Sequence, residues 1–340
     1  MGEAPLPLAA LRATFGDDVN VLDAPQPLAG GTMHPSWSVD IERDGATLPL
    51  VVRTTPPGRT DPAVASHEFE AITASLQQGA PAPAVHGVGA LESGDTFIIM
   101  TRMRGDANPR PLLRDPRFEH ARDAIIPQLA TALASVHRVD PAAIHVPLDG
   151  PAPGQDPILH QCDVLEAKYV EDRLERHPVI EWGLRWVARQ AAGNPAVPTA
   201  TLVHGDFRIG NVLYDETGLT TVLDWEGVHF SEPLEDLAWF CVRAWRFGVN
   251  SNEAGGVVSR DAWVDAYETA SGATVDRGRL ALWEILMNVR WAIIILNQVK
   301  THVTGIVRSQ ELAAIGRRTA ETELEILRLG RMYMEDGHAG

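Results

Sequence analysis

Lysine and cysteine are scarce in this chain of 340 residues. Its only lysines are Lys168 and Lys300, although lysine and arginine together number 29. Any phosphate contact in the first half of the chain must therefore come from arginine, from a helix end or from a metal ion. The cysteines Cys162 and Cys241 cannot build a disulfide framework. Their scarcity favours a reducing cytoplasm and predicts that both are small, buried apolar side chains.

Excess positive charge is also lacking. The formal net charge is −16, which argues against non-specific binding to nucleic acid. The first five residues show no basic run leading into an apolar core, so we expect no signal peptide. The most apolar long stretch, residues 280–299, contains Glu284, Asn288 and Arg290. It predicts a buried helix and no membrane span.

The chain is long enough for two lobes, and 45% of its residues are hydrophobic, as in a globular protein. Residues 1–103 are predicted to form a small α+β lobe. Its strands are expected at 37–41, 48–53, 85–91 and 96–103, and its one helix at 64–78. Residues 104–340 are predicted to form a mostly helical lobe, with helices at 117–139, 164–176, 179–192 and almost everywhere after 233. Short strands are expected only at 202–223, and residues 142–157 are expected to be a loop.

One polar motif indicates the chemistry. His204, Asp206 and Asn211 form the pattern His-x-Asp-x-x-x-x-Asn, and Asp224 follows a short apolar run. Phosphoryl transfer from ATP needs mainly positioning and charge neutralisation. Asp206 is placed to accept the proton of a substrate hydroxyl or to orient that hydroxyl. Asn211 and Asp224 offer the oxygen ligands that Mg²⁺ prefers, and the ion would bridge the ATP phosphates.

The neighbouring residues fit the same interpretation. Gly205 and Gly210 allow the tight backbone that brings the polar groups together. His204 is expected to brace the loop through hydrogen bonds. Arg208 is placed to contact the γ-phosphate and to stabilise the transferring charge. The motif alone is also compatible with ordinary turn residues, and the apolar strand before Asp224 favours the catalytic interpretation.

These segments resemble the aminoglycoside phosphotransferase and choline kinase group, through residues 204–211, 223–226 and 233–239. The ending, residues 315–324, is similar to bacterial "phosphotransferase family" proteins and to the kinase domains joined to acyl-CoA dehydrogenases in some eukaryotic proteins. The resemblance implies a two-lobed, protein-kinase-like α+β fold. It also implies ATP and Mg²⁺ as cofactors and a small molecule with a hydroxyl group as acceptor.

The resemblance places several nucleotide contacts in the first lobe. Gly30, Gly31 and Thr32 match the loop that covers the phosphates, where glycine lets backbone amides approach. Arg53 stands where such kinases usually have the lysine that contacts the α- and β-phosphates, and arginine can bond two phosphate oxygens. Glu68 is expected to pair with Arg53 from the following helix.

The strand ending near residue 103 resembles the segment that holds adenine. Met100 would lie behind the base, while the Thr101 carbonyl and the Met103 amide would bond its edge. Asp236, at the start of a helix, is expected to brace the catalytic loop or to cap backbone amides, and not to bind metal. Glu226 remains open between a supporting group and a substrate contact.

The acceptor site is expected between the catalytic loop and the helices that follow Pro233. Tryptophans and polar residues gather in that part of the sequence: Trp239, Arg243, Trp245, Arg246, Trp283, Asn288, Arg290 and Trp291. Arginines beside tryptophans suit an acid, a CoA thioester or an amphiphilic alcohol better than a polycation, although tryptophans also fill helical cores. The leading acceptor is therefore a hydroxyacyl-CoA or related metabolite.

Two alternatives remain open at this point. One is an aminoglycoside-type antibiotic as acceptor, and the other is a catalytically weak nucleotide-binding regulator. A protein kinase is disfavoured, because no activation segment ending in Ala-Pro-Glu follows Asp224. Nucleic-acid and membrane partners are not expected, and the sequence indicates no oligomeric state.

Overall fold

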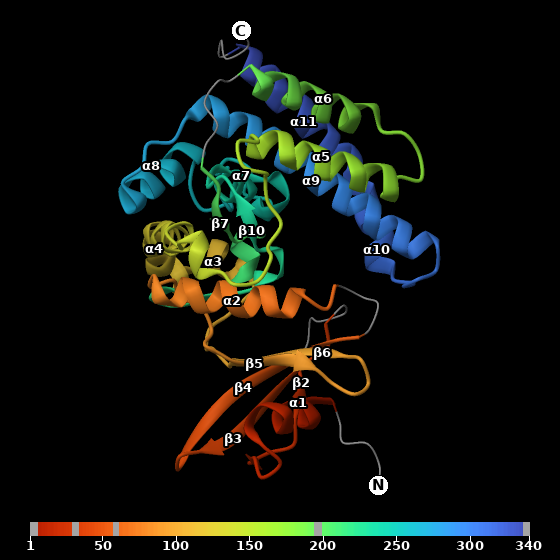
Figure 1. Ribbon diagram of the computed structural model, residues 1–340. Helices are drawn as coiled ribbons and strands as arrows, with labels where there is room; N and C mark the ends of the chain where they lie inside the picture. The colour runs from red at the N-terminus through yellow and green to blue at the C-terminus, as the bar shows by residue number, and fades with distance from the viewer. Residues whose placement is uncertain (1–5, 29–33, 57–60, 194–198, 336–340) are drawn as a thin grey trace.

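The computed structural model describes residues 6–28, 34–56, 61–193 and 199–335, and it has two lobes of different secondary structure (Figure 1). The smaller lobe contains a β-sheet and the larger one is mostly helical. The predicted fold class, a two-lobed α+β fold of the protein-kinase type, is confirmed.

Within the described residues, the smaller lobe is built on a six-stranded antiparallel sheet with the order β1-β3-β4-β6-β5, and β2 pairs with β3. Its strands are β1 (Asn20–Val21), β2 (Gln26–Pro27), β3 (Ser36–Arg43), β4 (Ala46–Thr55), β5 (Val85–Ala90) and β6 (Thr96–Thr101). Asp44 and Gly45 join β3 to β4 with positive φ at both positions, the backbone of a tight hairpin turn. Helix α1 (Leu6–Phe15), which the sequence analysis missed, packs Ala10 and Leu11 into the small core of this sheet.

Helix α2 (Val64–Gln77) lies between the two lobes (Figure 1). It contacts β5 and β6 of the sheet and also the short 3-10 helix η4 (Trp225–Gly227) of the larger lobe. Its buried residues Ala71, Ile72 and Ala74 belong to the large core, not to the core of the sheet. Although α2 precedes the lobe boundary expected near residue 103, it therefore packs as a layer shared by both lobes.

The larger lobe is dominated by helices. They are α3 (Pro109–Arg114), α4 (Glu119–His137), α5 (Pro157–Asp172), α6 (Pro178–Ala192), α7 (Leu234–Cys241), α8 (Arg260–Ser271), α9 (Arg277–Val303), α10 (Gln310–Ile315) and α11 (Thr319–Glu335). Two short antiparallel pairs lie beside them: β7 (Thr201–Val203) with β10 (His229–Ser231), and β8 (Val212–Asp215) with β9 (Gly218–Val222). The remaining 3-10 turns are η1 (Pro116–Phe118), η2 (Pro141–Ala143), η3 (Ile209–Asn211), η5 (Arg243–Arg246) and η6 (Gly316–Arg318).

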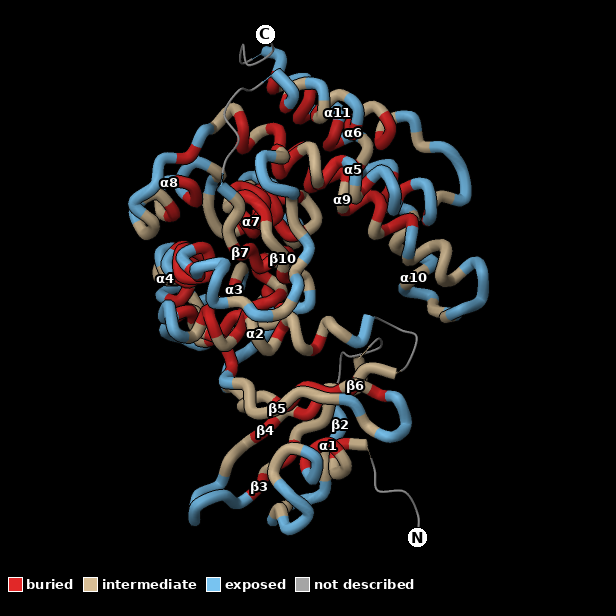
Figure 2. The backbone as a smooth tube through the Cα atoms, viewed as in Figure 1, coloured by how far each residue is buried: buried red, intermediate tan, exposed pale blue. Residues whose placement is uncertain are grey.

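Helix α9 forms the centre of the larger lobe. It contacts α5, α6, α7, α10 and α11, and much of it is buried where it meets them (Figure 2). By length and composition α9 passes the test for a membrane span, but 78% of its apolar window is buried inside the protein. This burial is that of a core helix, as the sequence predicted. Cys162 and Cys241 are also buried as predicted, and both are free thiols.

Some element bounds differ from the prediction. Helix α5 begins at Pro157, seven residues before the predicted start, because Asp156 caps it by accepting from the amide of Ile158. The same aspartate pairs with Arg279 of α9 through Nη1 (3.0 Å) and Nη2 (2.9 Å). The helix start is therefore fixed by a long-range ion pair. The segment between η5 and α8 was expected to be helical but consists mainly of turns.

Candidate active site

The two polar motif segments lie side by side in the larger lobe. Residues 204–211 connect β7 to β8, and Asp224 follows β9. Gly205 has a φ of +76°, and a Cβ atom there would lie 2.0 Å from the carbonyl oxygen of Gly227. Only glycine allows this contact, so Gly205 lets the catalytic loop touch the loop that follows Asp224.

Asp236 braces the catalytic loop from α7. Its carboxylate accepts hydrogen bonds from the backbone amides of His204 (2.7 Å) and Gly205 (2.9 Å), and it contacts Nε2 of His137 at 3.1 Å. Burial opposes ionisation, but the hydrogen bond and charge of His137 hold the pKa of Asp236 below its usual value. The predicted bracing contact is present. Asp236 caps the amides of the catalytic loop, whereas no side chain caps the start of α7.

His204 ties the same two loops together. Its Nδ1 accepts from the amide of Asp206 (3.2 Å), and its Nε2 donates to the carbonyl of Leu223 (3.1 Å). This pair of contacts requires a neutral ring with its proton on Nε2, and complete burial lowers the pKa of His204 in agreement. His204 therefore braces the loop, as predicted.

The Asp206 carboxylate is held by three side chains. Its Oδ1 accepts from Nε1 of Trp239 (2.6 Å), and its Oδ2 accepts from Nδ2 of Asn211 (2.5 Å). Arg208 Nε lies 3.2 Å from Oδ1 and 3.3 Å from Oδ2. The Trp239 contact is not predictable from the sequence, because the partners are 33 residues apart and no local pattern marks an indole as a partner of this carboxylate.

Asp224 and Asn211 have the chemistry of a magnesium site. Asn211 Nδ2 donates to Asp206, so the amide oxygen of Asn211 remains available for a cation. Burial and the nearby charges of Glu226 and Asp206 raise the pKa of Asp224 to about 6, and a bound cation would relieve this repulsion. Among the described residues, no group of three or more His, Cys, Asp or Glu side chains could hold a metal. The Asp224 carboxylate and the Asn211 amide oxygen nevertheless fit Mg²⁺, which usually combines one or two carboxylates with phosphates and water.

Arg53 and Glu68 form the predicted ion pair between β4 and α2. Both are largely buried, and burial raises the pKa of Glu68 to about 7 even though the charge of Arg53 opposes the rise. Glu70 lies on another side of α2, where it contacts Nδ1 of His145 at 3.2 Å. Glu68, and not Glu70, is therefore the carboxylate of α2 that faces Arg53.

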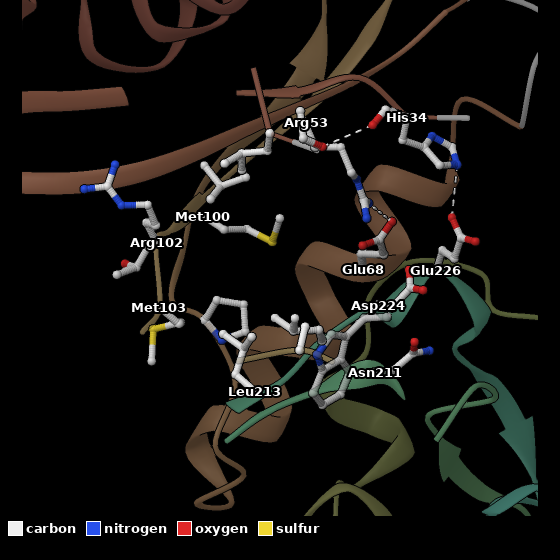
Figure 3. A pocket seen from close by; sticks show the side chains of 18 of the residues that line it. His34, Arg53, Glu68, Met100, Arg102, Met103, Asn211, Leu213, Asp224 and Glu226 are labelled. Atoms are coloured by element: carbon white, nitrogen blue, oxygen red, sulfur yellow. Dashed lines mark hydrogen bonds and ion pairs between the residues drawn. The ribbon is translucent and has the colours of Figure 1, made fainter. Parts of the chain in front are cut away.

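A cavity of about 780 Å³ lies between the sheet and the larger lobe. It brings together the described residues predicted to bind nucleotide and metal: Arg53, Glu68, Met100, Thr101, Met103, Asn211 and Asp224. In Figure 3, Met100 and Met103 lie on one side of this cavity, and Glu68, Asn211 and Asp224 lie on the other. Gly30, Gly31 and Thr32 lie outside the described residues.

A second cavity of about 460 Å³ adjoins the first, because Asp224, Glu226 and His34 line both. Asp206 and Arg208 line the second cavity and not the first. Its remaining walls come mainly from α7, η5 and α9, through Trp239, Trp245, Arg290, Trp291, Ile294 and Gln298. Asp224 thus lies at the junction of the two cavities, and Asp206 lies on the wall of the second.

Half of the predicted acceptor residues do not line this second cavity. Arg243 and Arg246 point to Glu325 of α11, with closest contacts of 3.6 and 3.8 Å. Trp283 is buried and donates to Glu232, and Asn288 is buried and donates to the carbonyl of Glu284. The prediction was wrong for these four residues, because their direction is set by tertiary partners such as Glu325 and Glu232, which sequence periodicity does not specify.

The role of His34 was likewise not predicted from the sequence. Its Nε2 lies 3.1 Å from Glu226 (Figure 3). Its Nδ1 lies 2.9 Å from Oγ1 of Thr55. The contact joins the smaller lobe to the larger one at the junction of the two cavities. The hydrogen bond from His34 lowers the pKa of Glu226. In this structure Glu226 is thus a lobe-bridging group.

The fold belongs to the protein-kinase-like class, and the motif residues Asp206, Asn211 and Asp224 lie on the walls of its two adjoining cavities. Residues 25–283 match the model of the phosphotransferase enzyme family, often called the aminoglycoside phosphotransferase (APH) family. The chain belongs to this family.

Solved structures of similar fold cover nearly the whole chain. A candidate aminoglycoside phosphotransferase from Ralstonia eutropha covers 97% of this chain and 97% of its own, with a TM-score of 0.72 and 21% identity. A complex of aminoglycoside phosphotransferase APH(4)-Ia with AMP-PNP and hygromycin B covers 94% and 97%, with a TM-score of 0.63 and 19% identity. At these identities the similarity shows the fold.

Sequence relatives include larger proteins. Acyl-CoA dehydrogenase family member 10 of Mus musculus is 28% identical over 219 residues, which are 62% of this chain and 20% of that protein. Family member 11 of Rattus norvegicus is 29% identical over 235 residues, 66% of this chain and 28% of that protein. The matched region spans about a fifth to just over a quarter of these relatives.

Proposed function

We propose that this protein is an ATP- and Mg²⁺-dependent kinase that phosphorylates a hydroxyl group of a small molecule. The observation that carries the proposal is that Asp224 lines both of the adjoining cavities, while Asn211 on the wall of the first is hydrogen-bonded to Asp206 on the wall of the second. A donor and an acceptor bound in the two cavities would meet at these residues, and such positioning supplies much of the catalysis of phosphoryl transfer.

The larger cavity would hold the nucleotide. Arg53, fixed by Glu68, would contact the phosphates. Met100 would lie behind the base, while the Thr101 carbonyl and the Met103 amide would bond its edge. Gly30, Gly31 and Thr32 would cover the phosphates. Structures of similar fold contain AMP-PNP, ADP or GDP, which supports a nucleotide in this place.

Asp224 and the amide oxygen of Asn211 would hold Mg²⁺, which when bound neutralises charge on the ATP phosphates. Asp206 would accept a hydrogen bond from the acceptor hydroxyl and take its proton as the hydroxyl oxygen attacks the γ-phosphorus. The bond from the γ-phosphorus to the bridging oxygen of the β-phosphate would break, and ADP would leave. Arg208, which now shares one N–H between the two oxygens of Asp206, would contact the γ-phosphate.

The charge of the second cavity supports an acceptor that carries an anionic or acyl group. His229 Nδ1 faces the carbonyl of Gly227 (2.8 Å), and its Nε2 faces the carboxylate of Glu235 (3.1 Å). Both partners are acceptors, so the ring must donate from both nitrogens and carry a positive charge. Burial opposes this charge, but Glu235 raises the pKa of His229 above its usual value.

Arg290 contacts the same Glu235 carboxylate at 3.1 Å and lines the second cavity. One buried carboxylate thus faces two cations, which leaves one surplus positive charge at the wall formed by α9. Of the carboxylates on the opposite wall, Asp206 is paired with Arg208 and Glu226 with His34, while Asp224 would be neutralised by the bound Mg²⁺. This arrangement suits an anion better than a polycation.

A hydroxyacyl-CoA or related metabolite is therefore the preferred acceptor, which also agrees with relatives named as acyl-CoA dehydrogenase family members. The alternative, an aminoglycoside, is favoured by the hygromycin B complex of a protein with similar fold. The scarce, buried cysteines favour a cytoplasmic location.

The test is a panel of hydroxyacyl-CoA thioesters and aminoglycosides with ATP and Mg²⁺, read by ADP release and by the mass of the product. We expect phosphorylated acyl-CoA products. Turnover of aminoglycosides alone would reverse the choice of acceptor. ATP binding without transfer to any alcohol would instead support a catalytically weak nucleotide-binding regulator.

A further inference from the structure

We propose that Trp239 is a positioning residue for Asp206. Its indole N–H fixes the carboxylate in the orientation needed to receive the acceptor hydroxyl, and its ring forms part of the acceptor wall. The consequence for transfer rests on the proposed function of Asp206, whereas the hydrogen bond itself can be tested separately.

The contact is short and buried. Trp239 Nε1 lies 2.6 Å from Oδ1 of Asp206, and Trp239 is only 2% exposed. An indole N–H can only donate, so it occupies one acceptor position of Oδ1 and leaves the other positions of the carboxylate for further partners. Because few atoms around a buried indole can move, the bond also restricts rotation of the carboxylate.

One face of α7 supplies two supports for the catalytic loop. Asp236 and Trp239 are three residues apart, and residues at this spacing lie on the same side of a helix. Asp236 binds the backbone amides of His204 and Gly205, while Trp239 binds the side chain of Asp206. The loop and its carboxylate are therefore positioned by the same rigid element.

Trp239 is also one member of a closed ring of contacts. Its ring packs edge-on against Trp245, with centroids 5.3 Å apart, and the guanidinium of Arg208 lies 4.7 Å from the centre of a Trp245 ring. Arg208 Nε in turn lies 3.2 Å from Oδ1 of Asp206, so the contacts link Asp206, Trp239, Trp245 and Arg208 in a ring. Arg290 lies 4.7 Å from the Trp239 ring centre. Trp239 therefore contacts both Asp206 and the cation that lines the second cavity.

Hydrogen-bond capacity separates the roles of these partners. The two carboxylate oxygens offer about four acceptor positions. The Trp239 and Asn211 contacts are 2.6 and 2.5 Å, whereas the divided contact with Arg208 is 3.2 and 3.3 Å. Arg208 is the partner most readily exchanged for an incoming hydroxyl, and Trp239 and Asn211 would then keep the carboxylate in place.

The first test compares Trp239→Phe with Trp245→Phe. Both variants keep an aromatic ring, but Trp245 Nε1 is buried with no hydrogen-bond partner among the described residues. With the best substrate of the acceptor panel, we expect Trp239→Phe to lower kcat roughly tenfold or more, with an unchanged KM for ATP. Trp245→Phe should lower kcat less. Equal losses in both variants, or no loss in Trp239→Phe, would overturn the positioning role.

The second test needs no acceptor. In protein with ¹⁵N-labelled tryptophan, the indole resonance that disappears in Trp239→Phe belongs to Trp239. Asp206→Ala should move this resonance upfield, because its acceptor is lost, while Glu226→Gln should leave it near its original position. If the chemical shift of the Trp239 indole N–H is the same in Asp206→Ala as in the unaltered protein, the hydrogen bond is refuted. If the resonance moves but no alcohol is phosphorylated by the unaltered protein, the hydrogen bond stands and the proposed function fails.

Discussion

The two adjoining cavities are held together in different ways. The larger cavity is formed by both lobes, and its principal cation, Arg53, has a carboxylate partner of its own in Glu68. The smaller cavity is lined mainly by the helical lobe, and its cation Arg290 shares Glu235 with a charged His229. The difference suggests that the first cavity is built for one constant ligand, whereas the charge of the second is available to select an acceptor.

Asp206→Asn is expected to have the largest effect on kcat. It should also distinguish most clearly between the roles of the two cavities, in acceptor transfer and in ATP binding. Asp206 lines only the smaller cavity, so its loss should lower kcat about 10²- to 10⁴-fold and leave ATP affinity nearly unchanged. Calorimetric titration with a non-hydrolysable ATP analogue, beside steady-state rates, measures both quantities. Near-normal turnover would show that Asp206 neither accepts the proton nor orients the hydroxyl.

Asp224→Ala should affect both cavities, because Asp224 lines both. Loss of a charge-assisted contact to the ion should weaken binding of the magnesium–nucleotide complex roughly 10- to 100-fold. Binding of nucleotide in the presence of EDTA is the control, since it should change much less. Equal weakening with and without Mg²⁺ would remove Asp224 from the metal site.

Arg53→Ala tests the larger cavity alone. The KM for ATP should rise about tenfold, since a charged contact to phosphate is lost. Glu68 would be left buried without its partner, so the double variant Arg53→Met with Glu68→Leu is a useful companion that removes both charges. An unchanged KM for ATP in both variants would place Arg53 outside the phosphate site.

The two cavities also differ in how far the sequence predicts them. The described nucleotide and metal residues that were singled out all line the larger cavity. Asn211 and Asp224 are marked by a local motif, whereas Arg53, Glu68 and the residues of β6 were placed by the resemblance to the family. The hairpin of β3 and β4 and helix α2 follow from turn residues and periodicity. Local sequence is sufficient where a site is built from consecutive residues of one loop or strand.

The acceptor side depends on packing between distant helices, which sequence periodicity does not specify. Arg243 and Arg290 look alike in the sequence, but the first pairs with α11 and the second lines the cavity. Trp239 and Trp283 likewise differ only through their tertiary neighbours, Asp206 for the first and Glu232 for the second. The contact of His34 with Glu226 joins two lobes and leaves no trace in either local segment.

The smallest expected effect is a pH dependence confined to the acceptor side. The pKa of His229 is raised in the folded protein, so its stabilising contribution is fully present below about pH 6.5 and is lost as pH rises through the folded pKa. Above the folded pKa, His229 would be neutral and Arg290 would be the one remaining cation paired with Glu235. The surplus positive charge that favours an anionic acceptor would then disappear. The KM for an anionic acceptor should therefore rise a few-fold, while the KM for ATP should change little.

His229→Gln is the matched control, because glutamine can still donate to Glu235 but does not titrate. Its KM for the acceptor should already be raised at pH 6 and should stay nearly constant up to pH 9, and its melting temperature should fall less over this range than that of the unaltered protein. The groups facing His229 are Glu235, Arg290 and the carbonyl of Gly227, and among the side chains Glu235 supplies the negative charge. If both proteins show the same dependence on pH, His229 does not control the charge of the acceptor wall. The contrast between the two cavities would then rest on shape alone.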